Sequence, residues 1–100
     1  MKSRTANAEE KKWMAAITEM GCVICNRELG VSSPPEIHHL NGKVKEGCHL
    51  QSIPLCYQHH REGSDNALFT SRHPSKKRFE ERYGTEQSLL DWARERLNWN

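Results

Sequence analysis

The sequence of 100 residues contains no long apolar run, and hydrophobic residues make up only 35% of the chain. A membrane-spanning helix needs about 20 mostly apolar residues, so we expect neither a membrane segment nor a membrane partner. The first eight residues are polar, and no apolar stretch typical of a secretory signal follows them. We therefore expect a protein of the reducing cytoplasm, while its oligomeric state stays open.

Cysteine is scarce as well, since the four cysteines are too few for a disulfide-rich secreted scaffold. A chain of this length buries a modest core, so we expect one domain held together by an additional staple. Residues 1–20 are expected to form an N-terminal helix, residues 21–73 a metal-stapled core, and residues 74–100 the C-terminal helices. A disulfide-bonded structural domain is a distant alternative.

Three stretches of the sequence predict helices. Apolar residues spaced three and four positions apart predict one over 8–20, with Asn7 as its N-cap and Gly21 at its end. Pro74 marks the expected start of another helix, and Thr85 is the expected N-cap of the last one.

Between these helices the sequence predicts a β-hairpin followed by a short helix. Residues 36–40 read as an extended segment, and the turn Asn41-Gly42 predicts that 50–53 returns as the second strand. Pro54 is expected to open a helix that includes 56–61, because proline is tolerated in a first helical turn. The predicted fold class is therefore α+β.

Two pairs of potential metal ligands have the spacing of a zinc site. Each pair has two residues between its members, and three thiolates with one imidazole would close a tetrahedral site without an open position. The set consists of Cys22, Cys25, Cys56 and His59. Two variations stay open, in which Cys48 replaces one ligand or His60 replaces His59. This set predicts a structural zinc ion.

The paired histidines predict a second, catalytic centre. His38 and His39 are neighbours on an expected strand, so their side chains point to opposite faces. This arrangement suits a metal ligand beside a general base, and His60 and His73 are candidates for the remaining ligands. A divalent ion with open positions and a neutral histidine base would together hydrolyse a phosphodiester. The alternative is that one of the paired histidines is structural.

These motifs resemble those of the HNH, or ββα-metal, endonuclease family, in which a hairpin and a helix hold one metal ion. The resemblance implies that His38 is the first metal ligand, that His39 is the general base and that His60 is the ligand on the helix. It also implies a magnesium-type ion, magnesium or manganese. The family's middle asparagine has no evident counterpart here, and the candidates are Gln51, His49 and Asn41.

The region from Gly21 to Leu90 is also similar to the Ref-like family of phage nucleases that depend on RecA. The similarity includes the run from Phe79 to Glu86, with the sequence FEERYGTE. It implies cleavage of DNA within a RecA filament or at a displacement loop, in phage recombination and hence in the cytoplasm of a bacterial host. It also favours His73 as a metal ligand, since a histidine precedes this run in the relative.

Clusters of basic residues suit a phosphate backbone, although the net charge is only +2. The candidate DNA contacts are Lys43, Lys45, Arg61, Lys76, Lys77 and Arg78. Because phosphate contacts carry little sequence information, we expect a weak sequence preference. The same residues could simply be solvated surface charges, and the second candidate function is a zinc-stapled module that binds DNA or a recombination protein without cutting.

Overall fold

The structure, a computed structural model, describes residues 4–99. Residues 1–3 and 100, which the predicted N-terminal and C-terminal parts of the domain include, lie outside the described range. In chain order the elements are α1 (Ala8–Met20), the π-helical turn η1 (Cys25–Leu29), β1 (Glu36–His39), the 3₁₀ turn η2 (Cys48–Leu50), β2 (Ser52–Leu55), α2 (Tyr57–His60), α3 (Lys76–Tyr83) and α4 (Glu86–Arg96). The predicted α+β class is confirmed.

Helix α1 begins and ends where its capping residues predict. The side chain of Asn7 accepts a hydrogen bond from the backbone N–H of Glu10, and the Glu10 carboxylate accepts one from the backbone N–H of Asn7. This reciprocal capping box satisfies two backbone donors at once. Gly21 ends the helix with φ 86°, and a Cβ there would lie 2.9 Å from the backbone oxygen of Ser33. Glycine therefore allows Cys22 to pass directly beside Ser33.

The two strands form one antiparallel sheet, in which Glu36 pairs with Leu55 and His39 pairs with Ser52. The second strand lies two residues later than the predicted 50–53, because the 3₁₀ turn η2 occupies 48–50. The prediction that Pro54 opens a helix is wrong. Pro54 lies within β2, and a strand of a two-stranded sheet has a free edge where a missing N–H costs little.

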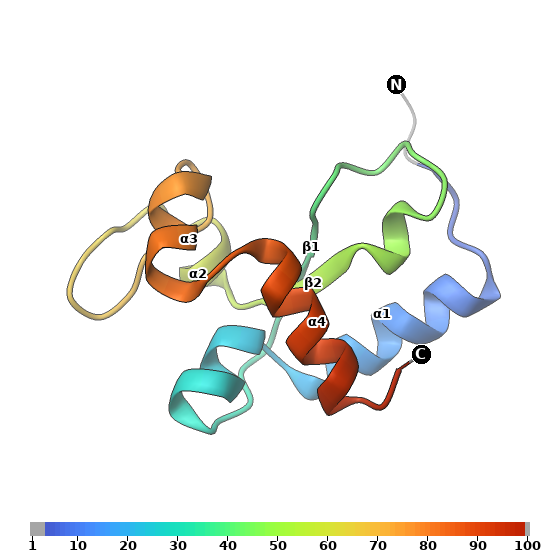
Figure 1. Cartoon of the computed structure of the whole chain (residues 1–100), viewed down its shortest axis with the longest axis horizontal. Helices are drawn as coiled ribbons and strands as arrows, with labels where there is room; N and C mark the ends of the chain where they lie inside the picture. Colours follow the sequence, from blue (N-terminus) through green and yellow to red (C-terminus); the bar gives the residue numbers. More distant parts are fainter. Residues whose placement is uncertain (1–3, 100) are drawn as a thin grey trace.

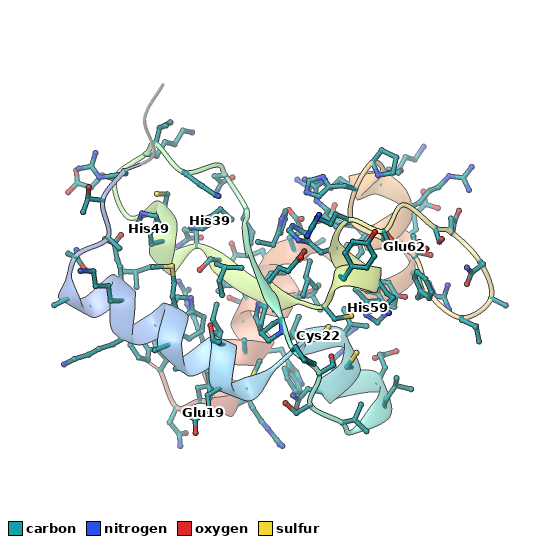
Figure 2. All side chains as sticks on the ribbon, turned by 180° about the vertical axis from the view of Figure 1, so that it is seen from behind. Glu19, Cys22, His39, His49, His59 and Glu62 are labelled. Carbon is teal, nitrogen blue, oxygen red and sulfur yellow. The ribbon has the colours of Figure 1, made fainter. Side chains whose placement is uncertain are left out.

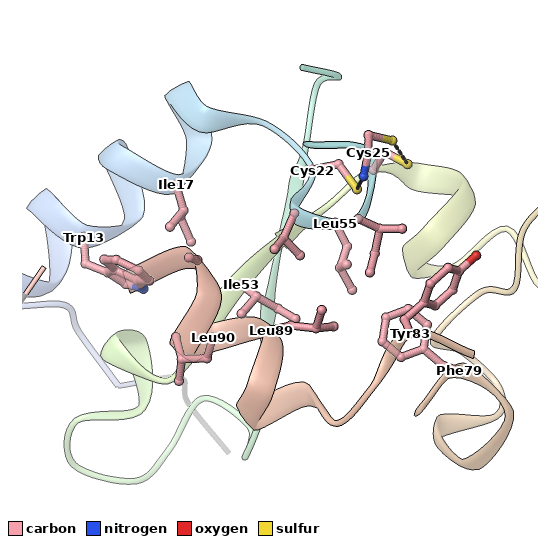
Figure 3. Packing of buried hydrophobic residues seen from close by; sticks show 14 residues of the cluster. Trp13, Ile17, Cys22, Cys25, Ile53, Leu55, Phe79, Tyr83, Leu89 and Leu90 are labelled. Carbon is pink, nitrogen blue, oxygen red and sulfur yellow. Dashed lines mark hydrogen bonds between the residues drawn. The ribbon is translucent and has the colours of Figure 1, made fainter. Parts of the chain in front are cut away.

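The hydrophobic core joins both strands to the first and last helices. In Figure 1, α4 crosses the hairpin while α1 runs beside it, and both helices contact β2. Figure 3 shows Trp13 and Ile17 of α1, Ile53 of β2, and Leu89 and Leu90 of α4 meeting in this core. All five are fully buried, and burial of each such side chain stabilises the fold by about 1.5–3 kcal/mol.

The segment after the hairpin forms a short helix, leaves it and then returns beside it. Helix α2 is one turn long, with Cys56 at its N-cap and Arg61 at its C-cap. The chain then loops out and returns, so that the backbone N–H of Arg72 donates to the carbonyl of His59 at 2.8 Å, and that of His73 to the carbonyl of His60 at 2.9 Å. These two bonds fix residues 72 and 73 beside α2.

Among the helices formed by residues 4–99, none combines the length and the apolar composition that crossing a membrane requires.

Candidate functional site

Three cysteines and one histidine gather between α1, η1 and α2. Their potential ligand atoms all lie within 4.8 Å of one another, and the four residues are Cys22, Cys25, Cys56 and His59. The two sulfurs of Cys25 and Cys56 are 3.9 Å apart, and the Cys22 sulfur lies 3.7 Å from Nδ1 of His59. Cys22 and His59 come from distant parts of the chain and meet at this point (Figure 2).

These distances fit one tetrahedral ion. Zn–S bonds of about 2.3 Å place two thiolate sulfurs about 3.8 Å apart, close to the separation of Cys25 and Cys56. All four cysteines of the chain are free thiols, so a disulfide does not staple this fold. Burial raises the pKa of the Cys22 thiol to about 12, and a bound cation would favour the thiolate instead. The cluster could therefore hold a metal ion.

The local fold explains why these four side chains converge. The backbone N–H of Cys22 donates to the carbonyl of Ser33 at 3.1 Å, which folds the chain around η1. Cys56 and His59 lie three residues apart across the single turn of α2 and therefore share a face. The ring of Tyr83 packs edge-on against His59 with centroids 5.3 Å apart. Cys48, the alternative ligand, is buried outside this cluster.

A second cluster of potential metal ligands is made of histidines alone. His38 of β1, His60 of α2 and His73 of the returning segment have potential ligand atoms within 4.8 Å of one another. Their ring centroids are 5.1 to 5.5 Å apart. His38 is buried and His73 is exposed, so the cluster reaches from the core to the surface. The structure thus brings together the three histidines that were predicted from the sequence as ligands of a catalytic metal.

Two histidines of this cluster contact a carboxylate. Nε2 of His38 lies 2.7 Å from Oε2 of Glu86, and Nδ1 of His60 lies 2.8 Å from Oε1 of Glu36. Because an ionised carboxylate only accepts hydrogen bonds, these contacts favour protons on the two named nitrogens. Nδ1 of His38 and Nε2 of His60 are then available to a metal ion. Such carboxylate–histidine pairs commonly orient metal ligands.

Glu86 is the buried centre of a small charge network. Only 2% of its surface is exposed, and its carboxylate also accepts a hydrogen bond from Nε of Arg72. Nζ of Lys76 lies 3.9 Å away. Burial alone would raise the pKa of Glu86, but the hydrogen bonds from His38 and Arg72 lower it below its ordinary value. Glu86 therefore stays ionised, as a partner of His38 must.

The second carboxylate, Glu36, lies nearer the surface. The guanidinium of Arg61 donates to both of its oxygens at 2.7 to 2.9 Å. Hydrogen bonds from Arg61 and His60 lower the pKa of Glu36 to about 2. Glu36, Arg72 and Glu86 were not among the site residues predicted from the sequence. Their positions in the sequence could have indicated a role, because Glu86 ends the FEERYGTE run and Glu36 lies two residues before the paired histidines.

His39 lies apart from the histidine cluster and contacts another histidine. Nε2 of His39 is 2.9 Å from Nδ1 of His49, and Figure 2 shows the two side chains together near the hairpin loop. Burial, with smaller effects of the nearby His49, Lys43 and His38, lowers the pKa of His39 to about 4. His39 is therefore a neutral imidazole at pH 7, and a weaker base than an exposed histidine.

The predicted DNA contacts have different surroundings. Lys43 and Lys45 are exposed on the hairpin loop, while Lys76 and Lys77 are exposed at the start of α3. The other two candidates already form ion pairs. Arg61 pairs with Glu36, and Nη1 of Arg78 lies 2.5 Å from Oδ2 of Asp65.

The described residues thus form a small α+β domain with two clusters of potential metal ligands. A family model described as recombination enhancement, RecA-dependent nuclease matches residues 6–98. The chain belongs to this family. The family's description implies nuclease activity on DNA, in recombination and in association with RecA.

Proposed function

We propose that this protein is a metal-dependent DNA endonuclease of the HNH type. The observation that carries the proposal is the cluster of His38, His60 and His73, whose potential ligand atoms lie within 4.8 Å of one another. A strand of the hairpin supplies the first of these side chains and the helix after the hairpin supplies the second. This order of elements is the one that the resemblance to HNH nucleases implies.

The Cys₃His cluster is proposed to hold a structural zinc ion. The support is its donor set and spacing, because three thiolates and one imidazole leave no open coordination position for a substrate. We further propose that residues 1–100 act as one nuclease domain. Its core, residues 21–73, would carry both metal sites, while the helices on either side complete the hydrophobic core.

In the proposed reaction, His39 acts as the general base. Its neutral imidazole removes a proton from water, the water oxygen bonds to phosphorus, and the bond from phosphorus to the leaving 3′ oxygen breaks. A divalent ion on the histidine cluster would stabilise the negative charge of that leaving oxygen. Glu86 and Glu36 hold His38 and His60 in the orientation that such an ion requires.

The donor set bears on which divalent ion is used. Imidazole nitrogen suits zinc, copper, iron and nickel, whereas magnesium and manganese both prefer oxygen ligands. For magnesium or manganese, we therefore propose that oxygen atoms of water and of the substrate phosphate would complete the ligand set. The context we propose is phage recombination in the cytoplasm of a bacterial host, with RecA-bound DNA or a displacement loop as substrate. The family's description supports the RecA and recombination parts of this proposal.

Exposed basic side chains are proposed to hold the phosphate backbone at the cleavage site. They are Lys43, Lys45, Arg61, Lys76, Lys77 and Arg78. Arg61 lies beside the histidine cluster through its ion pair with Glu36, and 60% of its side chain is exposed. It can therefore keep that ion pair while its outer N–H groups contact a phosphate.

Salt dependence tests this basic surface. We expect the logarithm of the DNA association constant to fall linearly as the logarithm of the salt concentration rises, because each phosphate contact releases a counterion. Replacing both Lys43 and Lys45 with glutamine should make the slope about one unit less steep for each phosphate that is no longer bound. Binding titrations on duplex DNA at several salt concentrations measure the slope.

A charge-matched control is the double replacement of Lys11 and Lys12 on α1 with glutamine. It should leave the slope unchanged if the hairpin loop binds the phosphates. Equal slopes for the wild type and the Lys43 and Lys45 variant would contradict the proposed role of the loop.

The proposed function is tested by cleavage of a displacement-loop DNA with magnesium or manganese, in the presence and absence of RecA. The wild type should cut, and His39→Ala should fold, keep its zinc and cut about 10²–10⁴-fold more slowly, because that is the usual contribution of a general base. Denaturing gels measure the cleavage, and elemental analysis measures the zinc.

Two outcomes would change the conclusion. If zinc-loaded wild type cuts under none of these conditions, the domain is a binding module. If it cuts and His39→Ala cuts equally fast, the nuclease stands but His39 is not its base. Cleavage that requires RecA would support the proposed substrate.

A further inference from the structure

A groove of about 780 Å³ opens beside the Cys₃His cluster, between η1, α2 and the loop that precedes α3. The cluster residues in its lining are Cys25, Cys56 and His59, whereas Cys22 is not part of the lining. Cys25 and Cys56 keep 7% and 5% of their surfaces exposed, and Cys22 is 0% exposed. A small molecule in the groove can therefore reach two of the three cluster thiols.

The walls of this groove are mostly apolar. They include Ile24, Leu29, Leu68, Phe69 and Tyr83. Leu29 and Leu68 are 68% and 84% exposed, so the apolar surface continues out to solvent. Because an ion loses its hydration at such a wall, the groove favours an uncharged molecule. A water molecule takes up about 30 Å³ in the liquid, and hydrogen peroxide, which is uncharged and only slightly larger, fits easily.

The two accessible thiols are also neighbours. The sulfurs of Cys25 and Cys56 lie 3.9 Å apart, and a disulfide bond of about 2.05 Å would require them to approach by about 2 Å. Cys56 is the N-cap of α2, a helix of a single turn. Such a short helix makes few internal hydrogen bonds, so a local movement of α2 toward η1 can close this distance.

Cys22 is the less suitable partner, although the C-x₂-C spacing of Cys22 and Cys25 is also that of redox-active pairs. The backbone N–H of Cys25 donates to the Cys22 sulfur at 3.5 Å (Figure 3). This hydrogen bond draws electron density away from the sulfur and makes it a weaker nucleophile. Cys48 is 2% exposed and lies outside the cluster. The structure therefore favours Cys25 and Cys56 over the pair that the spacing indicates.

We infer that Cys25 and Cys56 form an oxidative modification site, at which hydrogen peroxide converts the pair to a disulfide and opens the Cys₃His cluster. One of the two thiolates attacks a peroxide oxygen, the O–O bond breaks, and hydroxide leaves. The other thiolate attacks the sulfur of the resulting sulfenic acid, the S–S bond forms, and a second hydroxide leaves. The two thiolates lose two electrons, and one peroxide molecule gains them.

The disulfide removes two of the four metal ligands. Cys22 and His59 alone do not make a structural zinc site, because such sites have four ligands. Since the metal-binding free energy of these domains is folding free energy, the domain unfolds when its zinc leaves. A thiol reductant regenerates both thiolates. Peroxide thus inactivates the domain reversibly. The inference rests on the proposed zinc site and does not depend on DNA cleavage.

The experiment treats the zinc-loaded full chain carrying Cys48→Ala with excess hydrogen peroxide, alkylates the remaining thiols and maps the tryptic peptides by mass spectrometry. Trypsin places Cys22 and Cys25 in peptide 13–27, and Cys56 is then the single cysteine of peptide 46–61. We expect these two peptides to be joined, with the alkyl group on Cys22. We also expect one zinc ion released per disulfide, measured with a chromogenic chelator, and a parallel loss of helical circular dichroism. Dithiothreitol with added zinc should restore the helical signal.

Zinc-loaded protein that keeps its three cluster thiols in peroxide would overturn the inference. So would a disulfide between Cys22 and Cys25, which leaves the two peptides separate. If Cys48→Ala does not fold, the same mapping of the wild type decides, because fragmentation of the joined peptides distinguishes Cys56 from Cys48. Failure of the proposed zinc site looks different, since the reduced protein would then fold without zinc, and the inference would fall with that site.

Discussion

Replacing Cys25 with alanine should prevent the chain from folding. The zinc-binding free energy of such sites, about 10–16 kcal/mol, is folding free energy, because the unfolded chain has no preformed site. This binding free energy is as large as the whole free energy of unfolding of a small domain, about 5–15 kcal/mol. In this variant only three of the four ligands remain, and a metal ion bound to them would no longer connect η1 to α2. Circular dichroism, thermal unfolding and zinc content of the purified variant measure the effect.

The chain offers a matched control in Cys48→Ala. Cys48 is as buried as the cluster cysteines but lies outside the cluster, so this change removes one buried sulfur without touching a ligand. We expect it to fold, to retain its zinc and to lose about 1 kcal/mol of stability, as single buried substitutions commonly do. A folded, zinc-free Cys25→Ala protein would remove the structural zinc site from the proposal.

The second large effect is expected for His60→Ala. This variant should fold and keep its zinc, yet lose binding of manganese and about three orders of magnitude of cleavage rate. The reason is that a bound ion contributes several kcal/mol of charge stabilisation in the transition state, and each 1.4 kcal/mol is a factor of ten. Calorimetric titration with manganese and cleavage of displacement-loop DNA provide the two measurements.

The neighbouring residue supplies the control, since His59 and His60 are consecutive but belong to different clusters. His59→Ala should unfold the domain and release its zinc, whereas His60→Ala should leave both intact. Unfolding by both changes would mean that the histidine cluster serves the fold rather than a reaction. If His60→Ala cuts DNA at the rate of the wild type, the catalytic metal, if there is one, lies elsewhere.

Much of the fold was predictable where local chemistry decides it. Asn7 and Gly21 mark the ends of α1, and Thr85 caps α4, because capping depends on neighbouring residues. The assignment of Pro54 to a helix failed because proline at a free strand edge and proline in a first helical turn look alike in a sequence. Only the pairing with β1 distinguishes the two.

In the candidate site, the residues that could be predicted from the sequence are those whose types are distinctive metal ligands. Cysteines and paired histidines stand out in a sequence, whereas glutamate is common and can serve many purposes. Glu86 meets His38 across 48 residues of chain, and no spacing rule connects them. The contact of His39 with His49 likewise depends on how the hairpin loop folds back, which the turn residues alone do not fix.

The brevity of α2 has a consequence for how this site tolerates sequence change. A helix of four residues makes too few internal hydrogen bonds to hold itself, so its placement depends on Cys56 and His59 at its inner face. The side chain of Gln58 faces solvent and contributes little to that placement, whereas the ring of Tyr57 lies 5.1 Å from the Arg61 guanidinium that pairs with Glu36. A substitution at Gln58 should therefore leave His60 undisturbed, so this exposed position can change its chemistry beside an unchanged histidine cluster.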